Sequence, residues 1–197
     1  MNGMRSGPPR LWLEHFQAAL AATESASLTR RRTFRGRDGW IDFGSNDYLG
    51  LSCHPSVLQA ASQGTACGAG ASPVLCGYSA QQAELEAALA EFSSMESGLV
   101  FSSGYACNVG TLACLADRGD WILSDALNHA SLIDGCRLSR AERCIYPHGD
   151  FDFLRQELQA RRHLYSKVII LSESLFSMDG DEAPLGELVA LSEQYEC

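Results

Sequence analysis

The residues best suited to chemistry lie just after apolar segments of the chain. Gly104 and Tyr105 follow GLVFSS and begin a helical pattern, where free N–H groups and the helix dipole can hold an anion the size of a phosphate. His129 in DALNHAS lies at a second junction of this kind, where imidazole can cap a turn, stack on a flat ring or move a proton. Both segments can equally be plain turns, and that simpler interpretation stays open.

A third segment, SESLFSMDGDEAPL, supplies the hydroxyl of Ser177 and the carboxylates of Glu173, Asp179, Asp181 and Glu182. Neither the spacing nor the number of these carboxylates fits a known calcium loop, so we expect no metal site, and a solvated turn is the alternative. Five arginines between residues 30 and 37 could bind a carboxylate or a phosphate in a bidentate manner, although charge runs usually form a solvated face.

From residue 98 onward, apolar segments alternate with helical patterns. The apolar segments are GLVFSS, WILSD, RCIYPH and KVIILSES, and a helical pattern follows each of them. This alternation predicts an α/β fold with a mostly parallel sheet and helices on both faces. Because ligands of such sheets bind at the carboxyl ends of the strands, the candidate residues are expected to share one edge.

The chain is predicted to divide into residues 1–40 and 41–197. The first part holds an amphipathic helix, LWLEHFQAALAAT, and an arginine-rich arm, and a short strand candidate, WIDF, spans the boundary at residues 40–43. Ser79 and Gln82 predict a capped helix start. Lys167, the one lysine of the sequence, begins KVIIL and is therefore expected at the opposite edge of the sheet, about 20 Å from the strand ends.

Composition limits the class of protein. The formal charge of −9 has the wrong sign for binding nucleic-acid phosphates, and no segment is long and apolar enough to cross a membrane. We therefore expect no nucleic-acid or membrane partner and a cytoplasmic location. The eight cysteines lack metal-binding spacing and most lie in apolar stretches, which predicts buried thiols.

Five blocks of the sequence resemble one known family. They are FGSNDYLGLSCHPSV, GAGASPVLCGYS leading into ELEAALAEF, FSSGYACN, SDALNHASLIDGCRLS and SESLFSMDGDEAPL. In this order they resemble the α-oxoamine synthases, which are pyridoxal-phosphate enzymes of the aspartate-aminotransferase-like fold. The resemblance implies that this chain is the first, incomplete half of the large domain of that fold.

The resemblance also implies roles for particular residues. Pyridoxal 5'-phosphate (PLP) would contact Gly104 and Tyr105, His129 would stack on its ring as a catalytic residue, and Ser177 would lie near it. Arg30 or one of its neighbours would hold a substrate carboxylate. GYS and SMDGDEAPL most resemble the branch that condenses L-alanine with a pimeloyl thioester, carried by CoA or acyl carrier protein, with decarboxylation. Branches that make 2-amino-3-ketobutyrate, 5-aminolevulinate or ketosphinganine stay open, and family members are homodimers.

Two departures from the family pattern stand out. Pro73 and Gln82 occupy positions where the family has Arg and His. The segment whose aspartate pairs with the pyridine nitrogen is missing, as is the lysine that binds the cofactor covalently, and Lys167 lies at the wrong edge to replace it. Two hypotheses follow: part of an acyltransferase that is inactive alone, or a non-catalytic binding or interaction module. An unfinished sheet also predicts uncovered apolar surface and marginal stability.

Overall fold

The computed structural model describes residues 10–32 and 41–197, which belong to two units, 1–65 and 66–197. The regular elements of the first unit are α1 (Arg10–Ser25), the 3-10 turn η1 (Leu51–Cys53) and α2 (Pro55–Ser62). Helix α1 confirms the predicted N-terminal helix. The predicted division after residue 40 stays a prediction, and Arg35 and Arg37 of the arm lie outside the described residues.

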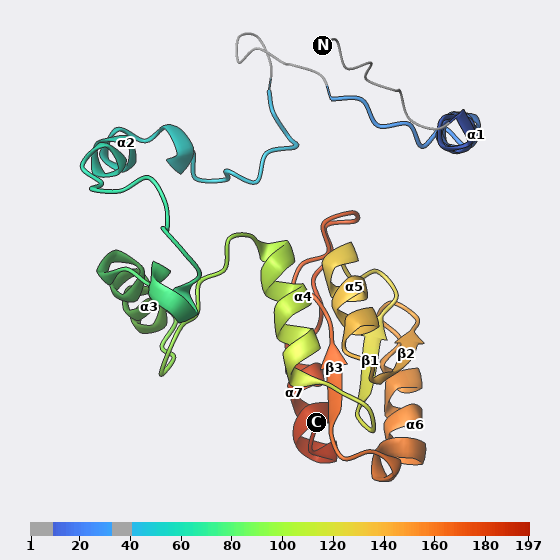
Figure 1. Ribbon diagram of the computed structural model, residues 1–197. Coiled ribbons are helices and arrows are strands. Elements are labelled where there is room, and N and C mark those ends of the chain that lie inside the picture. The colour runs from blue at the N-terminus through green and yellow to red at the C-terminus, as the bar shows by residue number, and fades with distance from the viewer. Residues whose placement is uncertain (1–9, 33–40) are drawn as a thin grey trace. The chain divides into compact units, whose positions relative to one another are not determined.

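The second unit contains the predicted alternation of strands and helices (Figure 1). Its elements are η2 (Pro73–Gly77), α3 (Ala80–Phe92), α4 (Gly104–Leu115), β1 (Trp121–Asp125), α5 (Ala130–Leu138), β2 (Glu142–Tyr146), α6 (Phe151–Arg161), η3 (Arg162–Leu164), β3 (Val168–Leu171) and α7 (Leu185–Tyr195). The Ser79 hydroxyl accepts a hydrogen bond from the Gln82 N–H at 3.1 Å, so α3 has its predicted N-cap.

The three strands form one parallel sheet in the order β2-β1-β3. Trp121 lies opposite both Glu142 of β2 and Val168 of β3, so the strands begin at one edge and end together at the other. All five residues of β1 are buried, as expected for a central strand covered on both faces. The predicted α/β fold with a parallel sheet is confirmed.

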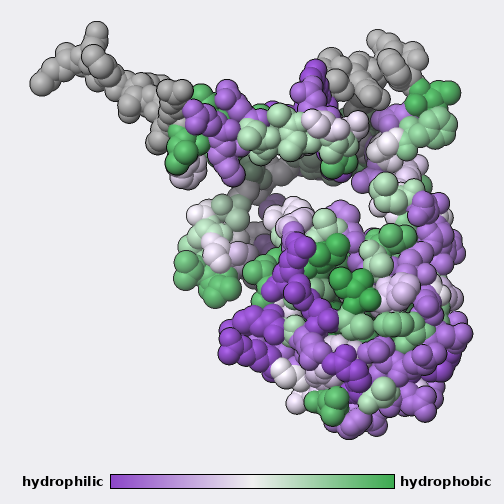
Figure 2. Space-filling view, turned by 90° about the vertical axis from the view of Figure 1, so that its right-hand side faces the viewer, coloured by the Kyte–Doolittle hydropathy of each residue, from purple (hydrophilic) through white to green (hydrophobic). Residues whose placement is uncertain are grey.

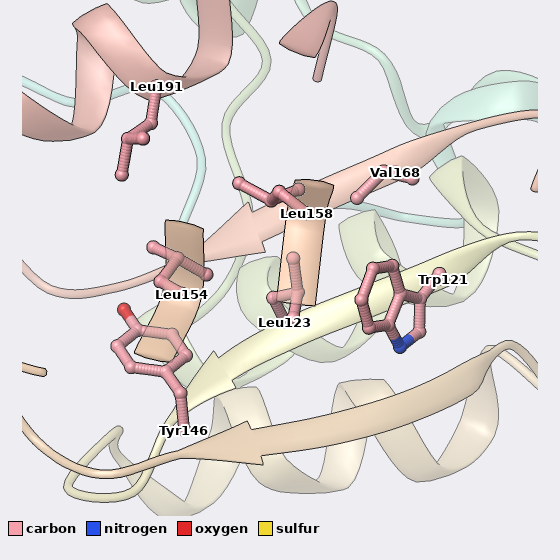
Figure 3. Packing of buried hydrophobic residues seen from close by; sticks show 7 residues of the cluster. All are labelled: Trp121, Leu123, Tyr146, Leu154, Leu158, Val168 and Leu191. Carbon is pink, nitrogen blue, oxygen red and sulfur yellow. The ribbon is translucent and has the colours of Figure 1, made fainter. Parts of the chain in front are cut away.

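Helices α6 and α7 pack on one face of the sheet (Figure 3). The buried cluster there comprises Trp121, Leu123, Tyr146, Leu154, Leu158, Val168 and Leu191. Burying one such Leu side chain contributes about 1.5–3 kcal/mol. Because side chains alternate along a strand, Ile122 points to the other face, where it packs with Leu112 of α4 and Leu132 of α5. Helices therefore cover both faces, as predicted.

Two of the predicted strands do not form. Residues 98–103 of GLVFSS are irregular, and so are residues 41–43 of WIDF, whose Trp40 lies outside the described residues. A strand needs a neighbour to accept its backbone hydrogen bonds, and no described strand pairs with either segment. The sequence pattern identified apolar, extended segments but could not supply their partners.

The expectation that most cysteines are buried is wrong. All eight are free thiols, and Cys136 is the only one that is fully buried. Cys53, Cys67, Cys76 and Cys114 are exposed, because the segments that carry them present those positions to solvent rather than to either core cluster.

Large apolar side chains also remain at the surface of the second unit. Leu99 is 72% exposed, Ile145 of β2 69% and Met178 88%. Hydrophobic areas are visible among polar ones in Figure 2. Contiguous apolar patches mark sites where another chain or segment packs, whereas single exposed apolar side chains are common on protein surfaces. None of the helices in the described part of the chain is both long and apolar enough to cross a membrane.

Candidate functional site

The N-terminus of α4 is open to a ligand. The Ser103 hydroxyl accepts the Ala106 N–H at 3.1 Å and so caps the helix. The N–H groups of Gly104 and Tyr105, in the first turn, have no acceptor within the helix. A Cβ atom placed on Gly104 would meet nothing within 4 Å, so the backbone there is accessible from outside. This geometry suits an anionic group.

Tyr105 connects the start of α4 to α5. Its hydroxyl donates a short hydrogen bond of 2.5 Å to the Asp134 carboxylate, which also pairs with Arg137 at 2.9 Å. The hydrogen bond to the carboxylate raises the pKa of Tyr105 above its usual 10.0, and the same bond, assisted by Arg137, lowers the pKa of Asp134. Asp134 carries no local signal of this role, because it lies 29 residues from its Tyr105 partner.

His129 is the exposed N-cap residue of α5, and its ring is oriented by Ser131. Ring atom Nδ1 accepts the Ser131 N–H at 3.2 Å and lies 2.7 Å from the Ser131 hydroxyl. That hydroxyl accepts a hydrogen bond from Asn108 of α4 at 2.9 Å, so its own proton is free to point at Nδ1. The neutral ring therefore carries its proton on Nε2, which this network leaves free.

The ends of β1 and β3 are joined next to His129. Asn128 is buried, and its Nδ2 donates to the Ser124 hydroxyl at 3.0 Å and to the Leu171 carbonyl at 2.9 Å. Its Oδ1 is buried without a hydrogen-bond partner. The His129 N–H donates to the Glu173 carboxylate, just beyond β3. These bonds bring the segment after β3 to the segment after β1, as the strand-end argument predicted.

His148, which the sequence analysis did not single out, lies just after β2 between two carboxylates. Its Nδ1 is 2.9 Å from Asp125 and its Nε2 is 2.7 Å from Asp181. The hydrogen bond to Asp125, followed by the one to Asp181, raises the pKa of His148 above 6.5. Its position after RCIY was the available signal, because that segment ends at the same sheet edge.

The remaining predicted residues fall in three places. Ser177 is exposed in the turn that follows β3, and Arg30 is exposed in the first unit, so its proposed contact with a substrate stays a prediction. Lys167 pairs with Asp120 at 3.3 Å where β3 and β1 begin, which confirms the predicted opposite edge.

The two departures from the family pattern occupy local turns. Pro73 begins η2, and Gln82 lies in the first turn of α3. Gly77 ends η2, and a Cβ there would lie 1.7 Å from the Ala71 carbonyl oxygen, so only glycine fits this turn.

The fold is that of an α/β protein with a parallel sheet. Its carboxyl edge carries an open helix N-terminus and an exposed imidazole, a geometry that suits a small phosphorylated ligand. Sequence comparison agrees with that class. The family model described as aminotransferase class I and II matches residues 38–197, and the chain belongs to this family.

Relatives with assigned names extend the comparison. An 8-amino-7-oxononanoate synthase from a Polaromonas species is 46% identical over 201 aligned positions, covering 94% of this chain and 48% of that protein. One from Burkholderia mallei is 51% identical over 162 positions, covering 79% and 41%. The predicted resemblance is thus confirmed, and the chain spans about half the length of the curated relatives it matches.

Solved structures share the fold. Serine palmitoyltransferase from Sphingomonas wittichii superposes with a TM-score of 0.80 at 32% identity, covering 93% of this chain and 50% of that chain. 8-Amino-7-oxononanoate synthase from Francisella tularensis gives 0.65 at 28% identity, covering 78% and 43%. A further structure, described as SPT with PLP, gives 0.80 at 26% identity and the same coverage as the first.

Proposed function

We propose that this chain is the first half of an 8-amino-7-oxononanoate synthase, a PLP-dependent acyltransferase of biotin biosynthesis. The complete protein would condense L-alanine with a pimeloyl thioester of CoA or acyl carrier protein, releasing carbon dioxide and the thiol. The names of relatives at 46% and 51% identity support this substrate pair.

The single observation that carries the proposal is the network at the carboxyl edge of the sheet. It links the start of α4 to His129 through Asn108 and Ser131, and links His129 to the segment after β3 through Glu173. An open helix start and an imidazole ring whose Nε2 is free in this network are thereby held together by chain segments far apart in sequence.

The residues of this edge fit PLP. The N–H groups of Gly104 and Tyr105 would bind the phosphate, because the helix start is open and capped by Ser103. The His129 ring, oriented by Ser131, would stack on the pyridine ring and keep water from that face. Ser177 would contact the cofactor, and Arg30 the substrate carboxylate. When bound, PLP supplies an electron sink for negative charge at the amino-acid α-carbon.

The chain as it stands is proposed to be inactive alone. Lys167 is held by Asp120 at the amino edge of the sheet, away from His129. The lysine and the aspartate that the resemblance implies would come from a second half, and the complete protein would be a cytoplasmic homodimer without nucleic-acid or membrane partners.

PLP titration of the purified chain tests the cofactor site. We expect saturable, non-covalent binding that His129→Ala weakens about two- to tenfold, the free energy of one ring stack. The matched control is His163→Ala. His163 is an exposed residue of η3 and lies near the amino edge of the sheet. After borohydride treatment, mass spectrometry should find no PLP on Lys167. Either an adduct at Lys167 or an absence of saturable binding contradicts the proposal.

A second test addresses substrates. The chain is combined with the C-terminal half of the Burkholderia mallei relative, and product formation is measured with alanine plus pimeloyl-CoA and with serine plus palmitoyl-CoA. The proposal expects product from the first pair only. Product from serine would favour the serine palmitoyltransferase branch, which the TM-score of 0.80 makes the second candidate. Glycine plus acetyl-CoA tests the 2-amino-3-ketobutyrate CoA ligase type, and no product from any pair favours the non-catalytic module.

A further inference from the structure

We propose that His148, doubly hydrogen-bonded between Asp125 and Asp181, is a positioning residue that latches the hairpin 174–183, and Ser177 within it, onto the carboxyl end of β1.

The hairpin 174–183 is a local structure. The Phe176 N–H donates to the Asp181 carbonyl at 2.9 Å, and the Gly180 N–H donates to the Phe176 carbonyl at 2.8 Å. The Ala183 N–H donates to the Ser174 carbonyl at 3.1 Å. Gly180 has a φ of +74°, the left-handed conformation that glycine adopts without strain. These bonds shape the hairpin but do not attach it to the sheet.

His148 makes that attachment in two ways. Its Nε2 lies 2.7 Å from the Asp181 carboxylate, and its ring forms a T-shaped contact with the buried Phe176 ring at a centroid distance of 4.5 Å. On the other side, Nδ1 lies 2.9 Å from Asp125, the last residue of β1. The imidazole thus bridges the central strand and the hairpin.

The protonation state of the bridge follows from its geometry. Both ring nitrogens face carboxylate oxygens, which only accept hydrogen bonds, and only the imidazolium ion donates from both nitrogens. The neutral ring would turn a lone pair toward one carboxylate. Loss of one proton should therefore release one of the two contacts.

The charged and titratable groups that face the ring agree with this state. Asp125 faces it from β1 and Asp181 from the hairpin, and the hydrogen bonds to both hold the pKa of His148 above its ordinary value. Tyr146, at the end of β2, lies near Asp125. Burial, and then Asp125, raises the pKa of Tyr146 to about 12, so this phenol stays neutral while His148 titrates.

The attachment of the hairpin through His148 can be measured in the absence of cofactor. Amide hydrogen exchange of the purified chain between pH 6 and 9, corrected for intrinsic rates, gives protection factors for Phe176, Gly180 and Ala183. If one proton controls the bridge, protection of these amides should be complete below pH 6.5, fall by up to about tenfold per pH unit as pH rises from 6.5 to the folded-state pKa of His148, and level off above it. His163→Gln, a histidine outside the bridge, should leave this profile unchanged.

Two variants sharpen the test. His148→Gln should lower protection of the hairpin amides at pH 6 and remove its pH dependence. Asp181→Asn should keep protection up to pH 9, because Nδ1–H of the neutral ring can still donate to Asp125 while Nε2 accepts from the side-chain amide introduced in the hairpin. His148→Gln could unfold the chain, which would be seen as lost protection in β1. In that case the pH profile of hairpin protection in Asp181→Asn tests the proposal by itself. Protection independent of pH in the natural chain, or a pH-dependent loss in Asp181→Asn, overturns the proposal.

The consequence for Ser177 rests on the proposed function. PLP affinity of the natural chain should fall with the same midpoint as hairpin protection, and Asp181→Asn should abolish that fall. If the hairpin responds as expected but the chain binds no PLP at any pH, the proposed function fails and the latch stands. If the chain binds PLP with an affinity independent of pH while protection changes, the positioning of Ser177 is refuted.

Discussion

The two edges of the sheet use charged residues in different ways. At the amino edge, cations pair with carboxylates at or near the surface: Lys167 with Asp120, and Arg161 with Glu142, with the Arg161 guanidinium over the Trp121 ring. At the carboxyl edge, an imidazole bridges two carboxylates instead. Buried polar atoms without a partner occur at both edges: Trp121 Nε1 at the amino edge, and Asn128 Oδ1, Tyr146 Oη and Asp181 Oδ1 at the carboxyl edge.

This difference indicates that the amino edge contributes to stability, whereas the carboxyl edge is suited to binding. Complementary ion pairs leave little for a ligand to bind, whereas acceptor-rich groups and an open helix N-terminus gain from one. The amino edge therefore closes the fold, and the groups of the carboxyl edge are the ones that we propose for ligand binding.

The largest expected effect compares one aspartate from each edge. Asp125→Ala should destabilise the chain by about 2–4 kcal/mol, because the Leu127 N–H and His148 lose their acceptor in a buried position. Asp120→Ala should cost about 1–2 kcal/mol, since its Lys167 partner is half exposed. Urea denaturation followed by circular dichroism measures both, and equal costs would remove the distinction between the edges.

Two single serine substitutions, one in the network and one as a control, test the network around His129. Ser131→Ala should cost about 1–3 kcal/mol, because Asn108 and His129 both lose a buried partner. The control, Ser166→Ala, changes an exposed residue of the amino edge and should stay within about 0.5 kcal/mol. Urea denaturation measures both variants, and a Ser131 effect as small as the control would show that the network does not stabilise the fold.

The two edges should lose stability at opposite ends of the pH scale. The pKa of His148 is raised, so its contribution is complete below pH 6.5 and is lost as pH rises through the folded-state value. The pKa of Asp120 is lowered, mainly by the Asp117 N–H and then by Lys167, so its contribution is present above pH 3.8 and is lost as pH falls through the folded-state value.

Differences in unfolding free energy between the natural chain and His148→Gln or Asp120→Asn, measured from pH 3 to pH 9, check these profiles. The His148 difference should shrink toward alkaline pH and the Asp120 difference toward acid pH. The same trend for both residues would contradict the comparison.

The smallest effect is expected for Lys167→Met. Lys167 is half exposed, and the buried Asp120 carboxylate keeps its hydrogen bond from the Asp117 N–H, so the loss should be about 0–1 kcal/mol, and PLP affinity should not change. Fluorescence titration with PLP and urea denaturation measure the two quantities. A marked loss of PLP binding would place this lysine at the ligand site after all.

Much of the fold could be predicted because its signals are local. The capped start of α3 at Ser79, the alternation of apolar segments and helices, and the positions of Gly104 and His129 all follow from neighbouring residues. The roles of His148 and Asp134 could not be predicted, because their partners lie 23 to 33 residues away in the chain.

The sequence by itself determined the α/β class, the edge at which the candidate residues gather and the wrong edge for Lys167, since strand direction and helix starts depend on local periodicity and capping. Only the tertiary structure decided that GLVFSS remains unpaired, that most cysteines are at least partly exposed and that one imidazole joins β1 to the hairpin. Strand pairing, burial and ion bridges depend on which distant segments meet, and one-dimensional patterns do not contain that information.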